Sequence, residues 1–450
     1  MPISSQLLLI SLTTSALLLG CSGKSDTPPP KNTDPTWHQD IAPFVAQRCS
    51  SCHNDDDDFA FDLSDYETVK PLASWMLTKM HGDSTPPYVM PPFGARDTEE
   101  CTPPAPWRDD PRPTDAELAL FEEWIEADTP EGDPDTAASL PTPETESLSG
   151  DNIETYTIAG ASLEEGDLED QYLCFPIPLG HTVESWITGL EVLPDNKDIT
   201  HHAVVFTDPN GEATDMAGDD GSYDCFGSAG VSDTTVLFAW APGGQPLDLG
   251  QHMGAHIPVG GQLVLQMHYH PTGSAAEDAS QLAVRMTDTQ PEKTAEMRVF
   301  GGILPDHTNS NKWEDPPFEV PAHAEHHVET WVEELQVPQG ADVRLYTVFP
   351  HMHLAGTDIK ISIEREDEEV CLTHNPSWDF EWQLTYMYDG EFEALPRLEP
   401  GDTLRIRCTF NNSVSNPILA EYIDETDIAV TGVGEDTFDE MCTAILGVVY

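Results

Sequence analysis

Short runs in which apolar and polar residues alternate fill the chain after residue 150, and this pattern constrains the fold more than any other feature of the sequence. Alternation with a period of two places the apolar side chains on one face of a strand. Clusters of Gly, Pro, Asn and Asp separate the runs, which is typical of antiparallel sandwiches and not of βαβ units. We therefore predict an all-β antiparallel architecture, with strands near residues 202–207, 262–269, 342–349, 358–364 and 403–410.

The β-rich region is longer than a single sandwich usually requires. Beyond a certain chain length one hydrophobic core no longer grows, and the chain divides into domains. We therefore predict two sandwich domains, at 151–290 and 291–450, with a break near residues 288–294.

Two segments rich in Ser, Pro and polar residues, 21–33 and 129–150, have the composition of flexible connections. The first would be a tether and the second an interdomain linker. Between them, Thr114 and Glu117 form a capping-box pattern that opens an apolar-periodic helix. We therefore predict a small all-α domain at residues 34–128.

A CxxCH sequence at residues 49–53 indicates one covalent haem of the c type. Two thiols at this spacing form thioethers with haem, and the next histidine supplies an axial nitrogen. A methionine followed by two prolines is the best candidate for the second axial ligand, and its surroundings resemble small bacterial c-type cytochrome domains. A CxxC disulfide or half of a zinc site is the alternative for the cysteine pair. The residues assigned to haem are Cys49, Cys52, His53 and Met90.

The first residues contain an apolar stretch that ends in Leu18-Leu19-Gly20-Cys21 and is too short to be a convincing membrane span. It resembles a bacterial lipoprotein signal, although no Lys or Arg precedes it. The resemblance implies a signal peptide at 1–20, lipidation of Cys21 and an outer-membrane anchor, because Ser22 stands where inner-membrane retention signals carry Asp. The lipid would be the chain's one contact with a membrane. An ordinary signal or a buried apolar segment is the alternative.

The chain carries 19 basic against 81 acidic residues, a formal net charge of −62. Such a surface repels nucleic acid and anionic headgroups, so we expect no nucleic-acid partner. A solvated acidic surface explains the charge, and capture of a basic partner is the alternative. The acidic run at 55–58 beside the haem motif is interpreted as a solvated loop, with calcium binding as the alternative. Nine cysteines indicate an oxidising compartment.

Imidazole and thioether side chains recur in the predicted sandwiches. Two histidines spaced by one residue share a strand face, and imidazoles with a thioether favour copper over zinc. The adjacent pair at 201–202 can share one metal only where the strand bulges or ends. His270 is the alternative to His268. The candidate metal ligands are His201, His202, His268, His351, His353 and Met441.

Five ordered segments resemble the copper type II, ascorbate-dependent monooxygenases, over roughly residues 160–450. They are Asp170–Cys174, His201–Phe206, Val264–Tyr269, His351–Gly356 and Asp439–Cys442. The resemblance implies two coppers: His201, His202 and His268 would hold the electron-transfer copper, and His351, His353 and Met441 the oxygen-activating copper. It also implies a disulfide between Cys408 and Cys442. A pairing of Cys174 with Cys225 is a guess, and Cys101 and Cys371 are unassigned.

The resemblance further implies hydroxylation of a substrate C–H bond with dioxygen, reduced by ascorbate or by an electron-carrier protein. Where the peptide-hydroxylating members bind a carboxylate, this chain has Phe349, Thr443 and Ile445, so we expect a neutral or apolar small molecule as substrate. Because ascorbate is an anion and the surface is acidic, the haem is expected to relay electrons. A non-catalytic haem and copper electron carrier, a copper-binding surface lipoprotein and a ligand-binding sandwich fused to a cytochrome are the alternatives.

Overall fold

The computed structural model describes residues 34–50, 52–54, 62–81, 89–141, 147–167, 170–225, 227–242, 244–366, 368–380, 382–434 and 438–450. The expected signal peptide, the tether with Cys21 and the acidic run at 55–58 lie outside the described residues. The chain separates into two units, Met1–Asp34 and Pro35–Tyr450. No helix in the described part of the chain has the length and apolar character that crossing a bilayer requires.

Residues 37–126 contain helices and no long strand among the positions that the structure describes. The helices are η1 (Trp37–Ile41), α1 (Ala42–Arg48), α2 (Tyr66–His81) and α3 (Asp115–Glu126). The predicted capping box is confirmed, because the Thr114 side chain accepts from the Glu117 amide and the Glu117 carboxylate accepts from the Thr114 amide. Aromatic side chains of η1, α1 and α3 form a separate buried core.

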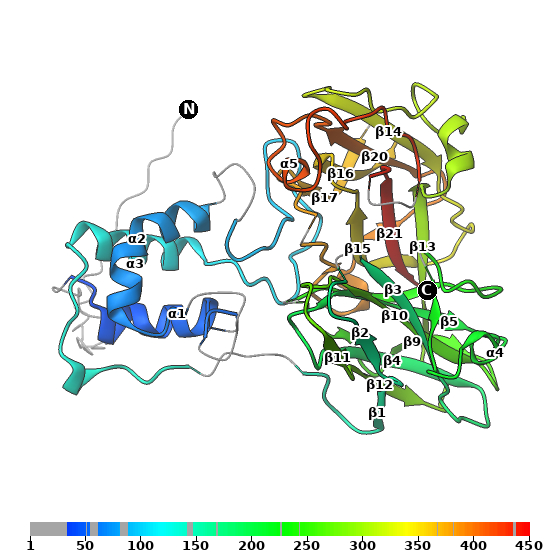
Figure 1. Ribbon diagram of the computed structural model, residues 1–450, viewed down its shortest axis with the longest axis horizontal. Helices are drawn as coiled ribbons and strands as arrows, with labels where there is room; N and C mark the ends of the chain where they lie inside the picture. The colour runs from blue at the N-terminus through cyan, green and yellow to red at the C-terminus, as the bar shows by residue number, and fades with distance from the viewer. Residues whose placement is uncertain are drawn as a thin grey trace, which may run out of the picture. The chain divides into compact units, whose positions relative to one another are not determined.

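The first β-rich half pairs two antiparallel sheets (Figure 1). One sheet contains β1 (Ile153–Thr157), β12 (Gln281–Thr287), β4 (Ser185–Leu193), β9 (Met253–Ile257) and β8 (Leu247–Asp248). The other contains β6 (Tyr223–Asp224), β3 (Gln171–Ile177), β10 (Gln262–Tyr269), β5 (Thr200–Asp208) and β7 (Val236–Trp240). Apolar residues of both sheets belong to one buried core. A short pair, β2 (Ala161–Leu163) with β11 (Ala276–Asp278), and α4 (Ala213–Met216) complete this half.

The second half repeats this arrangement. Its first sheet contains β13 (Lys293–Gly302), β21 (Cys442–Val449), β15 (Val343–His351), β18 (Tyr386–Met387) and β19 (Arg397–Leu398). Its second contains β14 (His327–Glu334), β20 (Thr403–Phe410), β16 (Gly356–Arg365) and β17 (Glu368–Asn375), followed by α5 (Leu419–Tyr422). The strand predictions near 342–349, 358–364 and 403–410 are confirmed by β15, β16 and β20. The structure is therefore mostly β, as the alternating runs predict.

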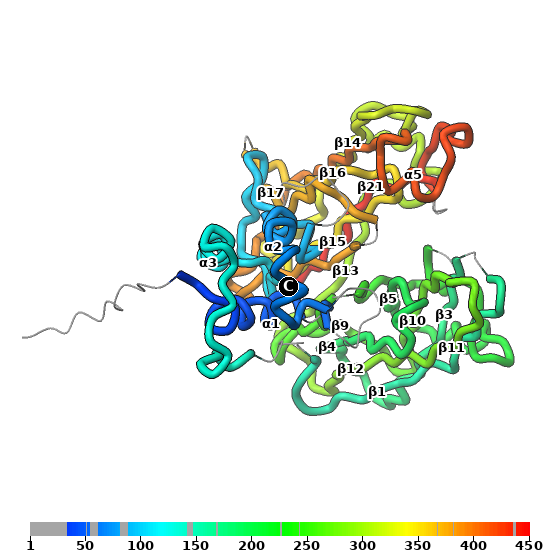
Figure 2. Tube along the Cα trace, turned by 60° about the vertical axis from the view of Figure 1, so that its left-hand side comes forward, coloured from blue at the N-terminus to red at the C-terminus, as the bar shows by residue number. Residues whose placement is uncertain are grey.

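The sheets of the two halves are joined edge to edge. Lys293 and Thr294 of β13 pair in parallel with Met253 and Gly254 of β9, which makes one continuous ten-stranded sheet. The tube view shows β9 and β13 side by side (Figure 2). This join lies at residues 293 and 294, within the range 288–294 in which the sequence predicts a break; the division into two domains stays a prediction.

Burial along the strands follows their place in the sheets. On β20, Leu404, Ile406, Cys408 and Phe410 are fully buried while the residues between them are half-buried, as alternation predicts. Every residue of β10 is buried, because this strand lies between β3 and β5 and a second cluster around Ala229 and Val231 covers its outer face.

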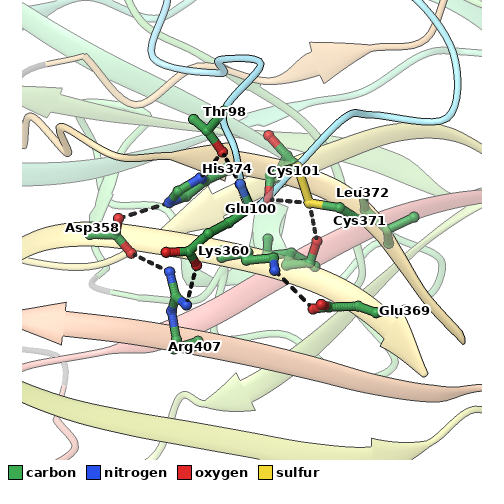
Figure 3. The surroundings of a disulfide bond; sticks show 12 residues. Thr98, Glu100, Cys101, Asp358, Lys360, Glu369, Cys371, Leu372, His374 and Arg407 are labelled. Atoms are coloured by element: carbon green, nitrogen blue, oxygen red, sulfur yellow. Dashed lines mark hydrogen bonds and ion pairs between the residues drawn. A yellow bond between two sulfur atoms is a disulfide. The ribbon is translucent and has the colours of Figure 1, made fainter. Parts of the chain in front are cut away.

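A segment that follows α2 packs on the second half. Cys101 forms a disulfide with Cys371 of β17, and the Thr98 hydroxyl lies 2.8 Å from Nδ1 of His374. Figure 3 shows this disulfide with Glu100, whose carboxylate lies 2.6 Å from Arg407. These contacts attach residues 98–101 to two strands of the second half, β17 and β20.

Candidate metal centres

The first candidate centre forms where β5 departs from regular pairing with β10. His268 pairs with His202, but the next residue, Tyr269, pairs with Thr200, so His201 is an extra residue in the ladder. This bulge is the local irregularity that adjacent ligands require, because in a regular strand His201 and His202 would point to opposite faces. His201, His202 and His268 consequently form a three-histidine cluster.

The three imidazoles meet through the same ring nitrogen. Nδ1 of His201 lies 3.1 Å from Nδ1 of both His202 and His268, and the third separation is 3.2 Å. Three mutual contacts cannot all be hydrogen bonds, because each Nδ1 either carries one hydrogen or offers one lone pair. Nitrogens that bind one metal tetrahedrally at about 2.0 Å lie about 3.3 Å apart, close to the spacing observed. The cluster therefore fits a metal ion held by three Nδ1 atoms.

Asp170 orients the buried histidine of this cluster. Its carboxylate lies 3.1 Å from Nε2 of His268 and 2.8 Å from Nδ1 of His270. A proton on Nε2 of His268 leaves the Nδ1 lone pair for the metal. Burial raises the pKa of Asp170, but the bonds to both histidines outweigh burial and hold this pKa well below its usual range. Tyr172 stacks on His268 at 4.2 Å between ring centroids.

The structure favours His268 over His270 as the third ligand. The side chain of His270 is 54% exposed and contacts the other oxygen of Asp170. It is not in the three-histidine cluster.

The second candidate centre lies at the end of β15, with His351 and His353 held 5.1 Å apart between ring centroids. Nδ1 of His351 lies 2.6 Å from Oε1 of Gln383, and the amide of Gln383 is oriented by donating to the Phe380 carbonyl. Nδ1 of His353 lies 3.1 Å from the carbonyl oxygen of Asp439. Because both partners are acceptors, both Nδ1 atoms carry hydrogen, and each Nε2 keeps a lone pair for a metal.

The chain at Met441 lies close to the end of β15. The antiparallel register pairs His351, the last residue of β15, with Thr443, two residues after Met441. Cys442, the next residue, forms a disulfide with Cys408 of β20, the pairing that the resemblance implied.

Glu440 is a residue of this centre that the sequence reasoning did not single out. Its buried carboxylate accepts from the amides of His353, Ala355 and Met441 at 3.1, 2.6 and 3.3 Å. Burial raises the pKa of Glu440 to about 8, although the amide bonds act in the opposite direction. An acidic residue directly before Met441, at the start of an apolar strand, was the available signal. Glu440 fixes the His353 loop to the strand that carries the thioether.

Burial favours the neutral form of three of the ligand imidazoles, those of His202, His268 and His351. It lowers the pKa of His351 to about 4 and also lowers the pKa values of His202 and His268. A neutral imidazole is the form that binds a metal, so these rings need not lose a proton first.

Phe380 lies between the two candidate centres. Its ring centroid is 6.2 Å from that of His201 and 6.4 Å from that of His353. One apolar side chain therefore contacts a ligand of each centre.

The residues at the expected substrate positions are either apolar or already hydrogen-bonded within the protein. Phe349 stacks on His351 at 6.1 Å, and Phe349 and Ile445 are both buried. The buried hydroxyl of Thr443 donates to the Gly302 carbonyl. No guanidinium stands at these three positions to bind a substrate carboxylate.

The residues expected to bind haem lie in or near the helical region. Burial, followed by the charge of Cys52, raises the pKa of the Cys49 thiol to about 12. Met76 and Met80 belong to the buried core of the helices, whereas Met90 is half-buried and donates its amide to the Lys79 carbonyl at 3.3 Å. Ser51, inside the CxxCH sequence, is outside the described residues.

Comparison with known proteins supports the copper interpretation over part of the chain. Residues 316–447 match the model of the copper type II ascorbate-dependent monooxygenase C-terminal domain. DBH-like monooxygenase protein 1 of Gallus gallus is 25% identical over 322 residues, 68% of this chain and 48% of that protein. The protein of the same name from Mus musculus is 26% identical over 267 residues, 56% of this chain and 39% of its own length.

This chain thus spans about half the length of these relatives or less. Among solved structures, the major capsid protein P2 of bacteriophage PM2 aligns over 66% of this chain and 97% of its own, at 10% identity and a TM-score of 0.25. So low a score carries no argument about this fold.

Proposed function

We propose that this chain is a copper-dependent monooxygenase of the copper type II, ascorbate-dependent family that hydroxylates a C–H bond of a small substrate. The observation that carries the proposal is the convergence of three Nδ1 atoms within 3.2 Å of one another. The matched segment 316–447 contains both histidines and the methionine of the second centre, which supports the same reading.

The proposed ligands form two sets, and each set would hold one copper ion with its own role. His201, His202 and His268 would hold the copper that supplies an electron, and His351, His353 and Met441 the copper that supplies dioxygen activation. A thioether stabilises Cu(I), which suits the second role. The imidazoles of His202, His268 and His351 need not lose a proton when they bind, because burial lowers their pKa values.

The surrounding residues position these ligands. Asp170, Gln383 and the Asp439 carbonyl each fix one imidazole tautomer, so the metal-facing nitrogen is set before binding. Phe380 contacts both His201 and His353 and would help keep water from the space between them.

The proposed substrate is neutral or apolar. Phe349 and Ile445 present hydrocarbon beside the second centre, and the Thr443 hydroxyl is already bonded to a carbonyl. A carboxylate in this place would lose hydration without gaining a cationic partner.

The N-terminal third is proposed to supply electrons. Cys49, Cys52, His53 and Met90 would hold one covalent haem that relays electrons from a carrier protein or from ascorbate. Lipidation of Cys21 would attach the exported chain to the outer membrane. The CxxCH spacing and the separate buried helical core support the first of these proposals.

The test is metal and haem analysis of the full chain from a host that attaches haem, with oxygen consumption under added reductant. Two coppers and one haem per chain are expected, and Met441→Ala should retain copper in the three-histidine centre while losing oxygen consumption. Copper and haem without any oxygen consumption would favour a non-catalytic electron carrier. Haem without copper would overturn the monooxygenase.

A further inference from the structure

Arg96 differs from every other arginine of the chain. The sequence has 11 arginines, all within the described residues, and ten of them have a carboxylate oxygen within 4.0 Å. Arg96 has no carboxylate oxygen of a described residue within this distance, although acidic residues number 81 in the sequence. Its Nη2 is buried and makes no hydrogen bond within the described structure. Arg96 as a whole is half-buried, but a buried guanidinium nitrogen without a partner is costly, so this position suits an anion.

A small cavity adjoins this guanidinium. It has a volume of about 40 Å³ and is lined by Val89, Pro92, Arg96, Asn375, Asp379 and Trp382, among others. The segment that carries Arg96 is fixed there, because its amide donates to the His374 carbonyl at 2.9 Å and the Gly94 amide donates to the Tyr386 hydroxyl.

No described carboxylate forms an ion pair with Arg96, although the charge of Asp110 acts to raise its pKa. Asp379 lines the same cavity but makes no ion pair with Arg96, and it is engaged in another contact. Arg112 adds positive charge nearby, while its own guanidinium is bound to Asp110 at 2.8 Å. Burial, and then the charge of Arg112, lower the pKa of Arg96.

Two further residues that carry side-chain N–H groups, Trp382 and Asn375, line this cavity. The indole nitrogen of Trp382 donates no hydrogen bond to any described residue. Asn375 is buried, with Oδ1 unpartnered and Nδ2 donating to the Tyr386 hydroxyl. With the amide turned over, Tyr386 donates its hydroxyl hydrogen to Oδ1, and Nδ2 becomes the unpartnered atom in place of Oδ1. That orientation satisfies the Tyr386 hydroxyl and adds a donor near Arg96.

We propose that Arg96, Asn375 and Trp382 form an oxyanion-binding site that takes a carboxylate or a comparable small organic oxyanion. A planar guanidinium with neighbouring N–H donors matches the geometry of such a group. The volume exceeds the roughly 10–15 Å³ that one enclosed water molecule needs on this measure, so a small polar head such as a carboxylate can enter. The rest of the ligand must extend out of the cavity.

The carboxylate or other oxyanion could come from two sources. Val89 and Pro92 flank Met90, so a carboxylate of the covalent haem is one source, and this arm rests on the proposed haem. A free anionic reductant such as ascorbate is the other. Trp382 is adjacent in sequence to Gln383, whose side chain contacts His351. Either anion would therefore bind next to a residue of the second centre.

The first experiment measures the haem reduction potential in the haem-loaded full chain. If a haem carboxylate is bound, Arg96→Gln shifts the potential to more negative values, because loss of a nearby positive charge favours the oxidised haem. Arg96→Lys restores part of the shift. Arg397→Gln, which removes a half-exposed arginine elsewhere, leaves the potential unchanged.

The second experiment titrates acetate, and ascorbate without oxygen, into the copper-free full chain at constant ionic strength, with chloride as control. Binding is followed by tryptophan fluorescence and by the melting temperature, with and without haem. Saturable binding in the wild type that is lost in Arg96→Gln supports the site.

The two experiments together separate the sources. Acetate that binds the haem-free but not the haem-loaded chain, with a shifted haem potential, identifies the haem carboxylate. Acetate that binds both forms, with an unshifted potential, identifies a free anion. No Arg96-dependent binding in the haem-free chain and no shift in potential would overturn the site. A chain that never acquires haem would refute the proposed haem, while the acetate titration would still test Arg96.

Discussion

The two candidate centres use opposite nitrogens of the imidazole ring. In the first centre the three histidines converge through Nδ1, and Asp170 holds Nε2 of His268. In the second, Gln383 and the Asp439 carbonyl hold the Nδ1 atoms of His351 and His353, which leaves Nε2 for the metal. The nitrogen that binds is therefore decided by the neighbour of each ring and not by the histidine itself.

The two centres also differ in the charge of the groups that orient their ligands. The first uses a carboxylate that lies close to its histidine, whereas the second uses a neutral amide and a backbone carbonyl. A carboxylate makes its imidazole a stronger ligand than a neutral acceptor does. The centres should therefore respond differently to changes in their surroundings.

The largest expected effect is loss of one metal at a time. His202→Ala should remove the copper of the first centre and leave that of the second, and His353→Ala should do the reverse. The two centres share no ligand and no strand, so loss of copper from one centre should not affect the other. Copper per chain and the electron paramagnetic resonance of Cu(II) measure this. Loss of both metals from either single variant would show that the centres form one unit.

The disulfides offer a second comparison. Cys174–Cys225 spans 51 residues and Cys408–Cys442 spans 34. Loop closure predicts that removing either lowers the free energy of unfolding by about 4 kcal/mol. Only Cys442 adjoins a proposed ligand, Met441, so only the Cys408→Ala/Cys442→Ala variant should also weaken copper binding at the second centre. Denaturant unfolding and copper titration measure the two effects, and equal copper affinity in both variants would contradict the assignment.

Acid should destabilise the metal-free protein through its neutral histidines. The pKa of His351 is about 4 in the folded chain, against 6.5 as the ordinary value. As pH falls from about 6.5 to 4, the unfolded chain therefore binds a proton that the folded chain does not. Linkage makes unfolding easier by about 3 kcal/mol from this residue. Urea unfolding of metal-free His351→Gln should show a smaller loss of stability over this pH range than wild type; an identical loss would argue against a buried neutral His351.

The smallest effect concerns the orienting groups. Asp170→Asn should weaken copper binding at the first centre about 10- to 100-fold, and Gln383→Ala should weaken the second centre by about tenfold or less. His270→Ala is the control, because it removes the other partner of Asp170 without touching His268. Copper competition titrations measure the affinities. A larger effect at Gln383 than at Asp170 would reverse the comparison between the centres.

Much of the β architecture was predictable because alternation of apolar and polar residues within a short segment indicates which face of a strand is buried. Alternation on β20 matches its burial residue by residue. The pattern was less informative for β10, where both faces are covered, and it could not reveal the parallel pairing of β9 with β13. Parallel pairing over two residues leaves no periodic signal.

The ligand histidines were easier to identify than the groups that orient them. Paired histidines are conspicuous, whereas Gln383 and Glu440 are ordinary residues whose partners lie 32 and up to 87 residues away along the chain. The Cys101–Cys371 disulfide could not be predicted for the same reason, since its cysteines are 270 residues apart. Such contacts depend on the assembled fold.

That disulfide also closes the chain into a large covalent ring. A protease that cuts once between Cys101 and Cys371 opens the ring but releases no fragment, because the sulfur bridge still connects the two pieces. The helical region would stay bound to the strands that carry His351, His353 and Met441. On a denaturing gel the two pieces would migrate as one species without reductant and as two species after the disulfide is reduced. A single cut would therefore not separate the proposed electron donor from its acceptor.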